Sequence, residues 1–179
     1  MRKRLRALRR DFVLAGGVPP IEFPELLERH VAPATIVASY LPTRFEAEPR
    51  KIAEHARALG ASLALPHVDS LAEPMRFLAW APGDPLEPNA FGIEQPASTA
   101  EECVPDIILA PLLGFDDALH RLGQGGGFYD RAFARFDRAL RIGIAWSIQQ
   151  LPDVPREAWD MPLHAVITER GLFGRNSIA

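Results

Sequence analysis

Cysteine, lysine and long apolar runs are scarce in this 179-residue chain. Its one thiol, Cys103, has no partner for an internal disulfide, which excludes the disulfide framework of a small secreted protein. Only Lys3 and Lys51 are available to chemistry that needs a lysine amine. No segment reaches the roughly 18 consecutive apolar residues that suggest a membrane span. We therefore expect a cytoplasmic protein with no membrane segment.

Several catalytic signatures are also missing. The five histidines lack the spacing of metal ligands, and no Gly-x-Ser-x-Gly nucleophile elbow occurs. Cys103 lies in an acidic stretch, which is expected to raise the pKa of its thiol. We therefore expect neither a histidine or cysteine metal centre nor a nucleophilic serine or cysteine.

Basic charge is concentrated at the amino end. Six of the 20 Lys and Arg residues lie within the first ten positions, whereas the whole chain has a formal net charge of -3. Apolar residues at Leu5, Leu8, Phe12 and Val13 are close to helical spacing, so residues 1–18 are expected to hold a basic amphipathic helix. Such a helix suits nucleic acid, a membrane surface or ligand phosphates, or is a solvated face. Nucleic acid is the less favoured partner because no interleaved aromatic residues or known motif accompany the arginines.

Apolar and amphipathic segments alternate along the rest of the chain. The proline-rich residues 82–96 are expected to form an ordered loop. The pattern predicts one α/β domain over residues 1–179, with an open, mostly parallel sheet and helices on both faces. The expected strands are residues 35–41, 61–66, 75–80, 106–113, 140–146 and 163–168, and the expected later helices are residues 49–59 and 129–139.

A glycine loop, residues 123–127, lies between a predicted strand and a predicted helix. Its glycines permit positive φ angles, and the following helix start favours anions, so the loop suits a phosphate. A tight glycine turn without a ligand fits the spacing equally well, because neither a Walker A motif nor a dinucleotide fingerprint is present. The full segment reads Arg121-Leu122-Gly123-Gln124-Gly125-Gly126-Gly127-Phe128-Tyr129-Asp130-Arg131.

Carboxylates accompany the loop in three places. Asp130 either interacts with the helix dipole or binds Mg²⁺ beside a phosphate. Glu46 and Glu48 follow the predicted strand at residues 35–41, which places them at the same sheet edge as the loop or simply on the surface. Asp160 precedes the last predicted strand, where it would by itself be a turn residue.

Further segments accompany the glycine loop in a fixed order along residues 35–173. They are Ser39-Tyr40-Leu41-Pro42 with Glu46, Phe91-Gly92-Ile93 with Gln95-Pro96, Pro105-Asp106, Pro111-Leu112-Leu113-Gly114-Phe115-Asp116, and Asp160 before Val166-Ile167-Thr168-Glu169. Together these segments resemble the 5-formyltetrahydrofolate cyclo-ligase family, also called methenyltetrahydrofolate synthetase. The glycine loop with Tyr129-Asp130-Arg131 is the most specific part of the resemblance.

The resemblance implies a fold of the sugar-phosphate isomerase and CoA-transferase type. It also implies conversion of 5-formyltetrahydrofolate to 5,10-methenyltetrahydrofolate, with ATP as co-substrate, Mg²⁺ as cofactor, and ADP and phosphate as products. Carried over residue by residue, it assigns catalysis to Arg121 and Tyr129 and magnesium to Asp130 and Asp160. The ATP-binding positions are Arg2, Arg6 and residues 121–129, and the folate-binding positions are Leu41, Glu46 and residues 124–128.

Two positions depart from the family pattern. Phe128 stands where a tyrosine is common, and Arg2 with Leu5-Arg6 replaces a Lys-x-x-Leu-Arg segment on a helix that is expected to be shortened at its start. Two alternatives therefore stay open: a folate- or nucleotide-binding paralogue without turnover, and a phosphosugar isomerase on the same architecture. For the ligase we expect a monomer that acts on reduced folate and ATP.

Overall fold

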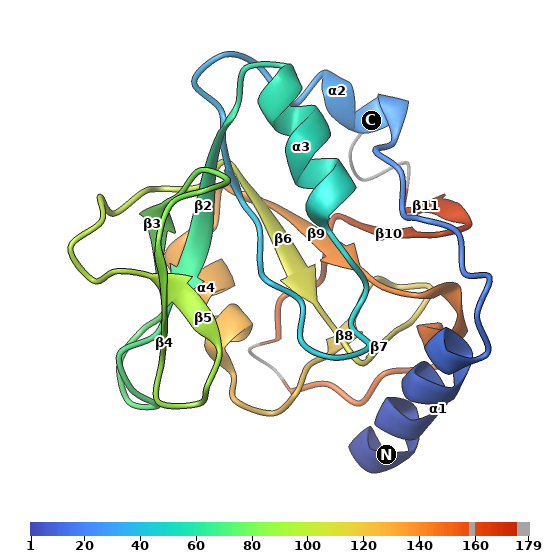
Figure 1. Cartoon of the computed structure of the whole chain (residues 1–179). Helices are drawn as coiled ribbons and strands as arrows, with labels where there is room; N and C mark the ends of the chain where they lie inside the picture. The colour runs from blue at the N-terminus through green and yellow to red at the C-terminus, as the bar shows by residue number, and fades with distance from the viewer. Residues whose placement is uncertain (158–159, 175–179) are drawn as a thin grey trace.

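A seven-stranded sheet forms the centre of the computed structural model, which describes residues 1–157 and 160–174 (Figure 1). The strand order is β11-β10-β9-β6-β1-β2-β3. The five inner strands run parallel, and an antiparallel strand closes each edge. The strands are β1 (Ile36–Ala38), β2 (Ser62–His67), β3 (Arg76–Ala79), β6 (Ile107–Pro111), β9 (Leu140–Ile144), β10 (Ala165–Thr168) and β11 (Gly171–Phe173).

Both faces of the sheet are buried, because successive side chains of a strand point to opposite sides. In β6, Ile107 and Leu109 pack into one apolar cluster and Ile108 and Ala110 into the other. The helices divide accordingly, and the prediction of a mostly parallel sheet with helices on both faces is confirmed. The first cluster includes side chains of α1 (Arg2–Leu14), α2 (Glu25–Glu28) and α3 (Arg50–Ala58), and the second includes side chains of α4 (Phe128–Arg135).

Most of the helices and inner strands lie where the sequence predicts them, and several are shorter, whereas α2 was not predicted. The helix expected to reach residue 139 ends at Arg135, and the chain then turns before β9. Gly60, just beyond α3, has a φ of 99°, as expected of a glycine that ends a helix. Within the described ranges, no helix combines the length and apolar character that crossing a membrane requires.

The prediction of an irregular loop over residues 82–96 is wrong. This segment forms an antiparallel hairpin of β4 (Leu86–Pro88) and β5 (Glu94–Pro96). Both strands end in a proline, and a two-stranded ribbon tolerates the missing N–H there. Asn89 closes the turn, because its Oδ1 accepts hydrogen bonds from the N–H groups of Phe91 and Ile93.

A second small ribbon, absent from the sequence prediction, delivers the chain to the glycine loop. It consists of β7 (Gly114–Phe115) and β8 (Arg121–Leu122), which pair antiparallel. β8 leads directly into residues 123–127, and α4 begins at the next residue. The loop therefore lies just past the carboxyl end of β6, at the sheet edge where ligands bind in open α/β folds.

The central strand provides a test of the packing. Ile108 is fully buried in β6, whereas Val104, four residues earlier, is 72% exposed. We expect Ile108→Ala to lower the free energy of unfolding by about 2–5 kcal/mol. The matched Val104→Ala change should stay within about 0.5 kcal/mol of the parent protein. Urea unfolding measures both, and equal effects would contradict the placement of β6 at the centre of the core.

Candidate active site

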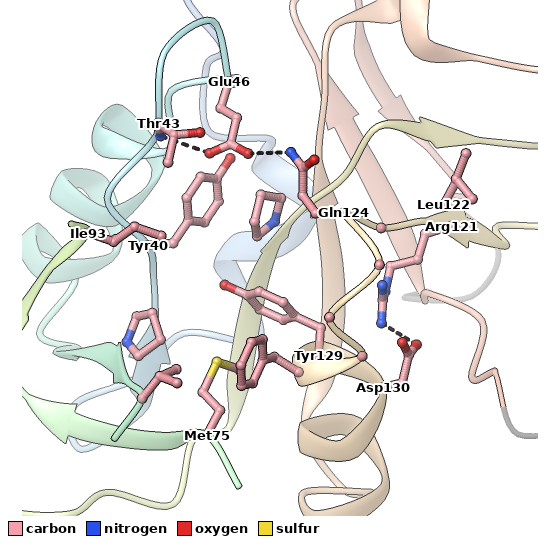
Figure 2. Close-up of a pocket in the computed structure, with 18 of the residues that line it drawn as sticks. Tyr40, Thr43, Glu46, Met75, Ile93, Arg121, Leu122, Gln124, Tyr129 and Asp130 are labelled. Atoms are coloured by element: carbon pink, nitrogen blue, oxygen red, sulfur yellow. Dashed lines mark hydrogen bonds and ion pairs between the residues drawn. The ribbon is translucent and has the colours of Figure 1, made fainter. Parts of the chain in front are cut away.

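A cavity of about 1010 Å³ opens at the carboxyl edge of the parallel strands. Its wall comes from α1, the segment after β1, the end of β2 and the segment that follows it, the hairpin β4–β5, the glycine loop and residues 155–157 and 160. Figure 2 shows part of this wall, including Glu46, Met75, Gln124 and Tyr129. Every site residue predicted from the sequence lies on this wall. They are Arg2, Arg6, Leu41, Glu46, Arg121, Leu122, Gly123, Gln124, Gly125, Gly126, Gly127, Phe128, Tyr129, Asp130 and Asp160.

The backbone of the glycine loop requires glycine at two positions. Gly125 has a φ of 109°, and Gly127 has a φ of 64° where it caps the amino end of α4. A Cβ atom at Gly126 would lie 3.0 Å from Cδ2 of Phe128, which also lines the cavity. The loop thus exposes its backbone to the cavity at a helix amino end, which is a favourable environment for an anion.

Arg121 and Asp130 join the two ends of this segment. Nη2 of Arg121 donates to Oδ1 of Asp130, and the guanidinium lies 4.8 Å from the ring centre of Phe133. Burial lowers the pKa of Arg121 from its ordinary value, and the Asp130 carboxylate opposes this shift. Within the described part of the chain, Nε of Arg121 is buried without a hydrogen-bond partner. A buried unpaired donor of this kind costs about 1–3 kcal/mol.

Arginines of α1 approach the loop from the other side. Nε of Arg2 donates to the carbonyl oxygen of Gly123 at 2.9 Å, and Nε of Arg6 donates to Oε1 of Gln124 at 3.0 Å. The basic amino-terminal helix therefore contributes side chains to the cavity, in addition to any role as a solvated face. These two contacts place the positive charges of Arg2 and Arg6 beside the glycine loop, where they would attract an anionic ligand.

Glu46 is held opposite the loop by two hydrogen-bond donors and one ion pair. Its Oε2 accepts from the N–H of Thr43 at 2.8 Å, and its Oε1 lies 3.2 Å from Nε2 of Gln124 (Figure 2). The same Oε1 lies 3.5 Å from Nη1 of Arg9, and both side chains are more than nine-tenths buried. Phe45, just before Glu46, has a φ of 69°, a strained backbone state of the kind that concentrates at functional sites.

Tyr40 and Tyr129 remain protonated across the neutral range. Burial, and then the Glu46 carboxylate, raise the pKa of Tyr40 well above its ordinary value. Burial raises the pKa of Tyr129 as well, again with a smaller effect of Glu46 in the same direction. The Tyr40 hydroxyl donates to the carbonyl oxygen of Ala47 at 2.6 Å, which fixes the segment that carries Glu46. Tyr129 presents a neutral hydroxyl group, and its residue lines the cavity.

Two carboxylates suited to magnesium share the cavity wall. Oδ1 of Asp130 bonds to Arg121, and Oδ2 of Asp160 accepts from the N–H of Glu157 at 2.8 Å. No cluster of three or more metal-ligating side chains occurs among the described residues. A pair of carboxylates still fits Mg²⁺, because this ion commonly binds one or two protein carboxylates together with substrate phosphates and water.

Sequence reasoning missed several wall residues. Arg9 lies three positions after Arg6, which in turn lies four positions after Arg2. This spacing places all three arginines on one face of a helix and could have indicated that Arg9 also lines the cavity. Arg156 also lines the cavity, and its Nη1 lies 2.9 Å from Nε2 of His120, which is held in turn by buried Asp116. No local pattern links these three residues, because tertiary folding alone brings them together.

Two other expectations have clear outcomes. Glu48 follows β1 as Glu46 does, but its side chain is 44% exposed, pairs with Arg50 and does not line the cavity. The expectation that the pKa of the Cys103 thiol is raised is confirmed in direction. Burial raises the pKa of its thiol, and Glu101 and Glu102 add to that shift.

The fold and the site define an open α/β protein whose cavity combines a glycine-rich loop with a buried carboxylate. The family model described as the 5-formyltetrahydrofolate cyclo-ligase family matches residues 2–169. The chain belongs to this family.

Individual relatives agree with that assignment. The Escherichia coli (strain K12) 5-formyltetrahydrofolate cyclo-ligase is 32% identical over 179 residues, which covers 94% of this chain and 96% of the relative. A Haemophilus influenzae protein of the same name is 37% identical over 97 residues, or 51% of this chain and 52% of the relative. The solved structure of Aquifex aeolicus 5,10-methenyltetrahydrofolate synthetase has a TM-score of 0.65 and 26% identity, covering 96% of this chain and 81% of that one.

The two tyrosines of the chain provide a pH test of the cavity. Both have a raised pKa, so an absorbance titration of the folded protein should show no tyrosinate near pH 10.0, where free tyrosine titrates. Below that pH both the folded and unfolded states hold the protons, and stability is unaffected by them. Above it the unfolded state loses protons first, so stability falls. Tyrosinate absorbance that rises near pH 10.0 without unfolding would contradict the burial of these hydroxyls.

Proposed function

We propose that this chain converts 5-formyltetrahydrofolate and ATP to 5,10-methenyltetrahydrofolate, ADP and phosphate. The formyl oxygen attacks the γ-phosphorus, and ADP leaves. N10 of the folate then attacks the activated formyl carbon, and the bond from that carbon to the phosphorylated oxygen breaks. Phosphate departs with the former formyl oxygen and takes up the proton that N10 loses, so atoms and charges balance without a covalent enzyme intermediate.

The observation that carries this proposal is the composition of a single cavity. One group of lining residues comprises the glycine loop and the guanidinium groups of Arg2, Arg6 and Arg121. A second group comprises Leu41 and Glu46 together with apolar side chains such as Met75 and Ile93. The first group suits a polyphosphate and the second suits a heterocycle with N–H donors, so both substrates fit in contact with each other.

Each residue has a simple role in such a reaction. Phosphoryl transfer needs positioning and charge neutralisation more than it needs a protein nucleophile. The unpaired Nε of Arg121 would donate to a phosphoryl oxygen, and the loop backbone would hold the neighbouring phosphates. Tyr129 keeps its proton and would act as a hydrogen-bond donor. Glu46 would accept from the pterin N–H groups and orient the folate.

Asp130 and Asp160 would hold Mg²⁺ in this scheme. Bound there, the ion would neutralise phosphate charge and orient the phosphates for in-line transfer.

We also propose that the enzyme is a cytoplasmic monomer.

A spectroscopic assay tests the proposed function. The methenyl product absorbs where the substrate does not, so its formation can be followed directly. We expect product only when 5-formyltetrahydrofolate, ATP and Mg²⁺ are all present, with one ADP released per product. A protein that binds both substrates without turnover would support the binding-only alternative. Isomerisation of a phosphosugar without ATP would support the isomerase alternative.

The two carboxylates can be distinguished by matched substitutions. Asp160→Asn and Asp130→Asn should each raise the Mg²⁺ concentration needed for half-maximal activity by at least about tenfold. Only Asp130→Asn should also lower the free energy of unfolding, by about 1–2 kcal/mol, because it weakens the ion pair with Arg121. Unchanged metal dependence in both variants would show that these residues do not bind the ion.

A further inference from the structure

Arg9 is a buried cation that the roles described above leave unassigned. It lies on the same face of α1 as Arg2 and Arg6, but only 5% of its surface is exposed, whereas those two residues are exposed. It lines the cavity together with Glu46 and Gln124. Burying a guanidinium is costly unless hydrogen bonds and an opposite charge compensate for the lost water.

The compensation for burying Arg9 is incomplete. The approach of Nη1 of Arg9 to Oε1 of Glu46, at 3.5 Å, is long compared with the roughly 2.7–2.9 Å of a tight charged hydrogen bond. The same oxygen is shared with Nε2 of Gln124 at 3.2 Å. Within the described residues, Nε and Nη1 of Arg9 are both buried without a hydrogen-bond partner. The Glu46 carboxylate therefore leaves part of the hydrogen-bonding capacity of the Arg9 guanidinium unused.

The local charge indicates what kind of ligand this is. Arg2 and Arg6 contact the glycine loop, where no carboxylate opposes them in the described hydrogen bonds. Arg9 instead lies beside Glu46, so the pair is close to neutral as a unit. An anionic phosphate would gain from Arg9 and lose to Glu46, whereas a neutral group with a donor next to an acceptor would gain from both.

We propose that Arg9 and Glu46 together recognise the pyrimidinone edge of the reduced folate, with Arg9 as the residue that determines specificity for its carbonyl group. This inference rests on the proposed function. Glu46 accepts from the ring N–H and amino group, and Arg9 donates to the adjacent ring carbonyl. This pairing matches the order of donors and acceptors along that edge of the ring. A hydrogen bond from Arg9 to the carbonyl oxygen would also offset part of the cost of burying its guanidinium.

The test uses Arg9→Met, which retains an unbranched apolar stem, and Arg9→Lys, which restores the charge without the planar fork. Arg10→Met is the matched control, because Arg10 is exposed on the same helix and pairs with Asp11. Dissociation constants are measured by calorimetry for ATP, for 5-formyltetrahydrofolate, and for a diamino analogue in which an amino group replaces the ring carbonyl.

We expect Arg9→Met to weaken folate binding by roughly ten- to hundredfold, with ATP binding changed less than about twofold. The parent protein should prefer the carbonyl form over the diamino analogue, and Arg9→Met should lose most of that preference. Arg9→Lys should recover part of the affinity, and Arg10→Met should match the parent in all three measurements.

Three outcomes would overturn the inference. They are unchanged folate binding in Arg9→Met, an equal loss of folate and ATP affinity, and a preference for the carbonyl form that survives the substitution. Thermal melting shows whether Arg9→Met is folded. If it is not, the inference is tested on Arg9→Lys, by the ratio of its dissociation constants for the diamino analogue and for 5-formyltetrahydrofolate. A parent protein that fails to bind folate would instead contradict the proposed function, so the two failures are distinguishable.

Discussion

The ion pair between Arg121 and Asp130 is the interaction on which the rest of the site depends. It joins the strand that enters the glycine loop to the first turn of the helix that leaves it. Glycines lose more backbone entropy on ordering than other residues, so a loop with four of them needs fixed ends. The pair supplies them, and Phe133 packs beneath the guanidinium. One buried arginine thus fixes both ends of the loop.

The amino-terminal helix completes the site from a distance in the sequence. Arg2 and Arg6 contact the glycine loop, and Arg9 pairs with Glu46 in the segment after β1. The local sequence of α1 does not indicate either contact. Leu5 anchors the helix, because it packs with Leu113 and Leu122 beside β8. The cavity therefore requires both the carboxyl edge of the sheet and the helix that covers it. Changes in α1 should consequently affect ligand binding more than folding, since much of its surface is exposed.

The parts that sequence reasoning predicted correctly are those with a local physical cause. Continuous apolar runs identify central strands such as β6, and a run of glycines identifies the loop that precedes α4. The hairpin of β4 and β5 was missed because prolines argue against strands, although they are tolerated at the ends of an isolated ribbon. Arg9 was missed because an arginine on an amphipathic helix usually faces water, and its burial against Glu46 arises only from tertiary contacts. Glu46 and Glu48 looked alike for the same reason.

The most direct test of phosphoryl transfer in this cavity follows the formyl oxygen. 5-Formyltetrahydrofolate labelled with oxygen-18 in its formyl group is converted with unlabelled ATP, and the released phosphate is analysed by mass spectrometry. Transfer of the γ-phosphoryl group to the formyl oxygen predicts one labelled oxygen in each phosphate released during turnover. Unlabelled phosphate, with the label lost to water, would show that ATP is hydrolysed separately from ring closure and would contradict the shared cavity as the place where the two substrates react.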